Sequence, residues 1–104
     1  MAAPPVTPVA GLISAVALGG TAAPAVPGGI SGGFITNPSS ASEQGLGAAE
    51  ALYVDPVGAA GTSGHGTTFT LQPGQSWPLI PGQTTQTSVN AISSGHRFSV
   101  VYWL

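Results

Sequence analysis

The chain has no cysteine and no lysine, and only four of its 104 residues are charged: Glu43, Glu50, Asp55 and Arg97. The lack of cysteine excludes disulfide frameworks, thiol catalysis and cysteine-ligated metal sites. With a single cation and a formal net charge of -2, the chain offers a phosphate backbone almost no positive charge. We therefore expect no nucleic-acid partner.

Long hydrophobic runs are absent as well. The best candidate, residues 9–18, is about half as long as a helix that spans a bilayer. No lysine or arginine precedes this run, so it lacks the positive region with which a secretory signal peptide begins. We expect neither a membrane-spanning segment nor a membrane partner.

Glycine and proline are abundant where charge is scarce. The chain contains 16 glycines and 10 prolines, which exclude a large helical core because both residues break helices. At this length we expect a single small domain, and such a domain buries little apolar surface by itself. Few surface charges also give little of the repulsion that keeps monomers apart. We therefore expect a homo-oligomer, a trimer or a similar cluster.

Residues 1–33 differ in composition from the rest of the chain. They contain no aromatic and no charged residue, but five prolines and three glycine pairs. This composition predicts an extended N-terminal arm that lies against a neighbouring subunit. The alternative is a short helix from about residue 9 to 18 that packs on its own domain. The aliphatic side chains expected to bind the partner are Val6, Val9, Leu12, Ile13, Val16 and Leu18.

Residues 34–104 show the pattern of a β-domain. Short runs of β-branched and aromatic residues alternate with turn sequences, such as the clean alternation in residues 67–71. Pro73-Gly74 and Pro81-Gly82 have the residue order of type II turns. The pattern predicts an all-β fold, a small β-sandwich or barrel of jelly-roll-like type, and leaves the topology open. The expected core is Leu52, Val54, Phe69, Leu71, Trp77, Leu79, Val89, Ala91, Phe98, Val100 and Tyr102.

Two tryptophans are candidates for partner contacts. Trp77 precedes Pro78 in a short strand, and because proline donates no ladder hydrogen bond we expect this strand to lie at a sheet edge, open to a partner, or to carry a bulge. Trp103 has the opposite phase to the core residues of the last strand, which indicates an interface anchor. Both faces of that strand are apolar, so we expect it to be central or to lie between the core and a neighbouring molecule. Exposed aromatic residues would alternatively suit a stacking platform for sugar rings.

Catalytic and metal-binding patterns are weak. Ser94 and His96 with Asp55 or Glu50 are the residue types of an acyl-transfer triad, but no spacing supports one. His65 and His96 with an acid could share a metal, again without a supporting motif. No nucleotide-binding glycine pattern is present. We expect no catalytic site, no metal and no cofactor.

Four segments carry a resemblance to a group of known proteins. Residues 33–38, 49–56, 66–77 and 87–103 resemble small structural proteins of tailed bacteriophage virions, of the capsid decoration (cement) or head-fibre-base type. The resemblance implies a β-rich module, often trimeric, that binds the outside of a shell of major capsid protein. It also implies that an N-terminal extension such as residues 1–33 can lie across neighbouring capsid subunits.

The sequence thus leads to one expected function and three alternatives. We expect a non-enzymatic decoration protein on the capsid exterior of a virion, which stabilises the shell as its arm clamps adjacent capsid subunits. One alternative is a carbohydrate-binding or host-adhesion module, indicated by exposed aromatic residues. The others are a tail or connector component and a small hydrolase that uses His96.

Overall fold

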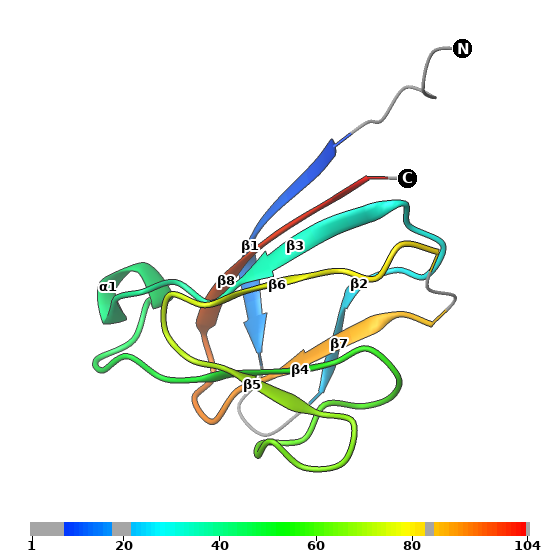
Figure 1. The fold of residues 1–104 in the computed structure, drawn as a ribbon. Coiled ribbons are helices and arrows are strands. Elements are labelled where there is room, and N and C mark those ends of the chain that lie inside the picture. Colours follow the sequence, from blue (N-terminus) through cyan, green and yellow to red (C-terminus); the bar gives the residue numbers. More distant parts are fainter. Residues whose placement is uncertain (1–7, 18–21, 83–84, 104) are drawn as a thin grey trace.

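Two four-stranded antiparallel sheets pack face to face in the computed structural model, which describes residues 8–17, 22–82 and 85–103 (Figure 1). The first sheet has the order β1 (Pro8–Ala17), β8 (His96–Trp103), β3 (Gly32–Thr36), β6 (Ser76–Pro78). The second has the order β2 (Ala23–Val26), β7 (Thr87–Asn90), β4 (Leu52–Asp55), β5 (Phe69–Leu71). These orders are those of a jelly roll, so the expected all-β, jelly-roll-like sandwich is confirmed.

The strands pair in a nested series. β4 pairs with β5, β3 with β6, β2 with β7 and β1 with β8, each time antiparallel. Two further ladders, between β3 and β8 and between β4 and β7, join these pairs into sheets. The last strand is therefore central and β6 is an edge strand, as their residue patterns predict.

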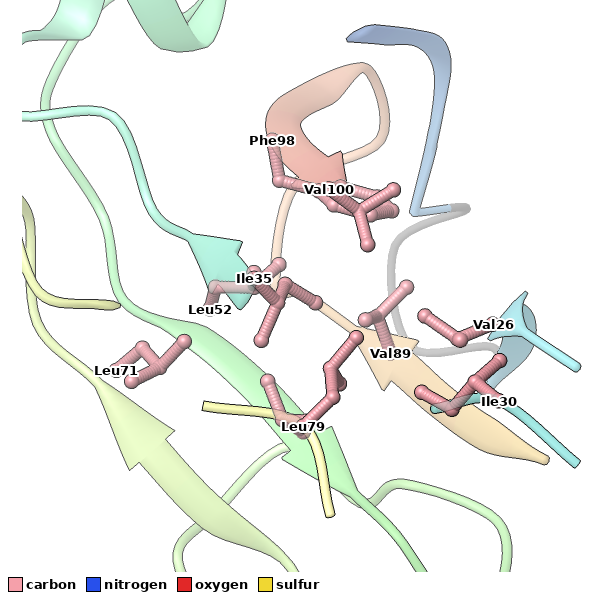
Figure 2. Close-up of a cluster of buried hydrophobic side chains, with 10 residues drawn as sticks. Val26, Ile30, Ile35, Leu52, Leu71, Leu79, Val89, Phe98 and Val100 are labelled. Carbon is pink, nitrogen blue, oxygen red and sulfur yellow. The ribbon is translucent and has the colours of Figure 1, made fainter. Parts of the chain in front are cut away.

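The core lies between the sheets and takes residues from both (Figure 2). Of the eleven residues predicted as core, eight are buried, and Phe69, Trp77 and Tyr102 are partly buried against them. The sequence reasoning missed Val26, Ile30 and Ile35, which are at most 3% exposed. Two of these three belong to the segment interpreted as an arm.

The described part of residues 1–33 contributes strands to both sheets. β1 pairs with β8 from Pro8 opposite Trp103 to Ala17 opposite His96, so the alternative of a helix over residues 9–18 is wrong. A helix would leave the outer side of β8 without a ladder partner. β2 likewise pairs with β7. Of the expected partner-binding residues, Val6 and Leu18 lie outside the described residues, and for Val9, Leu12, Ile13 and Val16 only the backbone is described.

A single helical turn, α1 (Ala41–Gln44), lies beside the start of β8 (Figure 1). Ser40 caps its first turn by accepting a hydrogen bond from the Glu43 backbone N–H at 3.2 Å. Gly45 ends the turn in the left-handed conformation that favours glycine, with φ of 74°. The turn holds the buried side chain of Gln44 at the end of the sandwich.

Candidate functional site

An apolar stripe crosses the outer face of the first sheet, on the side away from the core. Phe34 in β3 is 48% exposed and stands opposite Val101 of β8 and Pro78 of β6. Trp103 follows two positions after Val101 and therefore lies on the same face. We call these four residues, Phe34, Pro78, Val101 and Trp103, the outer patch. No charged residue belongs to it.

The two aromatic rings of the outer patch contact each other. The ring centroids of Phe34 and Trp103 are 6.2 Å apart, with planes tilted by 59°. Trp103 lies over Gly32, where a Cβ would stand only 3.0 Å from the indole ring. The glycine thus makes room for the ring on the sheet surface. The structure brings Trp103 to the outer face, as its phase predicts.

Trp77 lies on the opposite side of the sheet. Its ring packs against Phe69 at a centroid distance of 4.7 Å and is half-buried against the core. The edge position expected for its strand is confirmed, but the side chain itself points between the two sheets. The two tryptophans therefore do not form one surface.

A polar cleft of about 430 Å³ adjoins the outer patch. Thr36 and Ser99, the next outward residues along β3 and β8, form its floor, and Thr36 shares a 2.7 Å hydrogen bond with Ser76. Glu43 stands at its side and accepts hydrogen bonds from the hydroxyls of Ser39 and Ser40. The remaining lining residues are Asn37, Pro38, Ser39 and Gly74. The outer face therefore passes from aromatic rings to hydroxyl groups and one carboxylate.

Behind this cleft lies a buried network centred on Asn37. Its Nδ2 donates to the carbonyls of Glu50 and Leu71, both at 2.9 Å, and its Oδ1 contacts His96 Nε2 at 2.7 Å. Gln44 Nε2 donates to the same Oδ1 at 3.0 Å. Asn37, Gln44 and His96 are each 0% exposed. We call these three residues with Glu50 the buried cluster.

The carboxylate of Glu50 completes the buried cluster. Its Oε2 accepts a 2.6 Å hydrogen bond from the Ser93 hydroxyl, whereas its Oε1 is buried and has no hydrogen-bond partner. The Nδ1 of His96 is likewise buried and unpartnered. Burial lowers the pKa of His96, and the nearby charge of Glu50 raises it by less, so the pKa lies below its ordinary value.

A second polar network involves Asp55 at the end of β4. One carboxylate oxygen accepts from the backbone N–H groups of Val57 and Gly58, each at 2.8 Å. The other accepts from the hydroxyls of Thr67 and Thr68 at 2.7 and 2.9 Å. Burial raises the pKa of Asp55, but these four hydrogen bonds outweigh that effect and lower it. Asp55 therefore fastens the long loop between β4 and β5.

The residues of the sequence-level triad hypothesis are not arranged for acyl transfer. His96 is fully buried and its Nε2 contacts Asn37, while Glu50 Oε2 accepts from the Ser93 hydroxyl. His65 is exposed in the loop between β4 and β5. Over the described ranges, no three histidine or acidic side chains gather closely enough to hold a metal ion. The same ranges contain no helix with the length and apolarity to cross a membrane.

The sequence carries no signal for the buried cluster or the cleft. The cluster joins residues up to 59 positions apart, and polar residue types alone do not show which of them are buried. Comparison of the chain with protein-family models, with curated proteins and with solved structures finds no match.

Proposed function

We propose that this protein is a non-enzymatic capsid decoration protein of the tailed-phage type. It binds the outside of a shell of major capsid protein and stabilises that shell. The observation that carries the proposal is the uncharged outer patch on a chain with only four charged residues. A protein whose surface is short of charge and bears an exposed aromatic side chain, Phe34, beside a half-buried one, Trp103, is suited to being covered by another protein.

The partner surface is defined by what the outer patch lacks. An uncharged, apolar stripe gives no electrostatic complementarity, so its partner must itself be apolar at the point of contact. Burying Phe34 and Trp103 there would contribute most of the binding free energy, because large aromatic side chains dominate interfaces of this kind. A protein that binds the assembled shell but not the separate capsid subunits would then stabilise the shell by mass action.

The N-terminal segment enters the proposal through β1. β8 occupies one side of β1, and within the described sheet the other side is an edge. Such an edge offers backbone N–H and C=O groups to an added strand. A strand of an adjacent capsid subunit, or of a second copy in a trimer, would fit there. This gives the segment expected to clamp neighbouring subunits a way to do so without leaving its own sheet.

The fold agrees with the proposal by analogy. Jelly rolls occur in viral capsid proteins and also in lectins, so the architecture is compatible with both a virion role and a sugar-binding role. A shared fold does not determine function.

Quantitative mass spectrometry of purified virions tests the proposal. Hundreds of copies per particle, cross-linked to one shell protein, are expected. A handful of copies would replace decoration by a tail or connector role, and absence from the particle would overturn both. In a rebinding assay on stripped particles, we expect Phe34→Ser to weaken attachment at least tenfold. Val57→Ser, which alters an exposed apolar residue in a loop of the second sheet, is the matched control.

A second candidate function has a specific observation in its favour. Phe34 and Trp103 lie on one face next to a hydroxyl-lined cleft, which is the combination of stacking surface and hydrogen-bonding groups that sugar rings require. A glycan array with wild-type protein and with Phe34→Ser distinguishes the two functions. Binding that Phe34→Ser removes would favour an adhesion module. An array without bound glycans would leave decoration as the function.

A further inference from the structure

The buried cluster fastens the segment from Asn37 to Glu50, which contains α1, to the rest of the sandwich. Asn37 donates to the carbonyl of Leu71 in β5 and contacts His96 in β8. Gln44 donates to the carbonyls of Pro38 and Glu50 and accepts from the Glu50 backbone N–H. The same segment supplies Asn37, Pro38, Ser39 and Glu43 to the wall of the polar cleft. The buried cluster therefore controls the position of one cleft wall.

The hydrogen bonds determine where the proton of His96 lies. Asn37 Nδ2 donates to two carbonyls, so the atom that faces His96 is an oxygen, which can only accept. His96 Nε2 must therefore carry a hydrogen and donate it. In the neutral ring the unpartnered Nδ1 then carries only a lone pair. A second proton at Nδ1 would place a positive charge in a fully buried position.

Few groups could stabilise that charge. From the segment that covers the ring, Glu50 presents a carboxylate already bonded to Ser93. From α1, the Glu43 carboxylate is exposed and bonded to Ser39 and Ser40. On β8 itself, Arg97 is exposed and its side chain lies beside Gly45, where its positive charge gives no help. Burial outweighs the effect of Glu50, so the folded protein has a lower pKa at His96 than the unfolded chain.

We propose that His96 is an acid-sensitive latch: its protonation releases the segment from Asn37 to Glu50 and so opens the wall of the polar cleft. Releasing this segment is the least disruptive way to hydrate the imidazolium, because the other side of His96 lies in the sandwich. The segment has one helical turn and three side chains in the buried cluster, whereas β8 is paired with β1 as far as His96 and with β3 from Ser99 to Trp103. The inference holds whichever molecule binds the outer face.

Amide hydrogen exchange at pH 7 and pH 5.5 tests the latch, after correction for the pH dependence of intrinsic exchange. The reporter is the Glu50 amide, which donates to Gln44, and the reference is the Val54 amide in β4. Below about pH 6.5 we expect opening at Glu50 to increase by up to about tenfold per pH unit in the wild-type protein. Opening at Val54 should stay much rarer than opening at Glu50 at both pH values.

Two variants make the test specific. His96→Gln keeps an N–H donor near the position of Nε2 but does not titrate, so the pH dependence at Glu50 should disappear. His65→Gln alters the chain's other histidine, in an exposed loop, and should leave the pH dependence unchanged. The latch is overturned if His96→Gln retains the wild-type pH dependence, or if Glu50 and Val54 open equally, because equal opening means global unfolding.

If His96→Gln does not fold, the ring itself supplies the test. NMR of the wild-type imidazole should show the tautomer with hydrogen on Nε2 at pH 7. The Glu50 amide should then shift in step with protonation of the ring. A ring with its hydrogen on Nδ1, or one that titrates without any change at Glu50, would contradict the latch.

Discussion

His96 and Asn37 meet at 2.7 Å in the interior although 59 residues separate them in the sequence. The contact ties the first residue of the central strand β8 to the residue that follows β3. Both side chains are fully buried, and Asn37 bonds two backbone carbonyls in addition. The end of the sandwich is thus held by polar side chains where a hydrophobic core would ordinarily continue.

Asn37→Ala should therefore be strongly destabilising. It removes the hydrogen bonds of Asn37 to His96 Nε2 and to the carbonyls of Leu71 and Glu50, of which the Glu50 carbonyl keeps only its bond from Gln44, and unsatisfied buried groups are expensive. We expect the free energy of unfolding, measured in urea, to fall by about 3 kcal/mol. Ser99→Ala, which removes an exposed hydroxyl from the neighbouring cleft, should change it by less than about 0.5 kcal/mol. Equal effects of the two variants would refute the structural role of Asn37.

Asp55→Asn should remove a pH-dependent contribution to stability. The pKa of Asp55 is lowered in the folded protein, so its stabilisation is present above the unfolded value near 3.8 and is lost as pH falls through the folded pKa. We expect the variant to lose about 2 kcal/mol at pH 7. Below about pH 4 the free energy of unfolding should fall less steeply with decreasing pH in the variant than in the wild type. The two slopes should differ by up to about 1.4 kcal/mol per pH unit. Parallel curves between pH 4 and pH 2 would count against this assignment.

Gly33→Ala should disturb the ladder between β3 and β8. A Cβ at Gly33 would stand 2.2 Å from the Val101 carbonyl oxygen, so the two strands would have to separate. We expect a loss of about 3 kcal/mol in thermal or urea unfolding. Gly47→Ala meets no atom within 4 Å and is the control. A Gly33→Ala protein as stable as Gly47→Ala would show that the strands do not approach so closely.

Ile30→Ala tests whether the N-terminal third of the chain belongs to the core. Ile30 is 3% exposed and packs in the core cluster, whereas Ile80 is 48% exposed. Truncation of the buried isoleucine should lower the free energy of unfolding by about 3 kcal/mol, because it leaves a cavity. Ile80→Ala should lower it by less than about 1 kcal/mol. If both substitutions have the small effect, residues near Ile30 do not pack on the sandwich.

The fold was predictable where side-chain alternation reports burial. In β8, Phe98 and Val100 alternate with exposed Arg97 and Ser99, and the same period identifies Leu71 in β5 as core. The edge position of β6 followed from the missing N–H of Pro78. These properties are local, so a single sequence contains them.

The contribution of the N-terminal segment was not predictable in the same way. Val26 and Ile30 stand among prolines and glycines, and this composition indicates an extended arm. Their burial becomes visible only in the structure, where β2 pairs with β7 and both side chains pack in the core. The candidate site has the same limitation. The ring contact between Phe34 and Trp103 and the position of Asn37 behind the cleft depend on how strands distant in sequence are paired.

The nested pairing of the strands implies an order of folding. Val54 pairs with Phe69 over the smallest separation in sequence, Thr36 with Ser76 and Ala23 with Val89 over larger ones, and Pro8 with Trp103 over nearly the whole chain. Because loop-closure entropy rises with the length of the loop, the inner pairs form first and each brings the next pair closer. Of the strands that the structure describes, β1 is synthesised first, yet it must wait for β8, the last of them, before it can join its sheet.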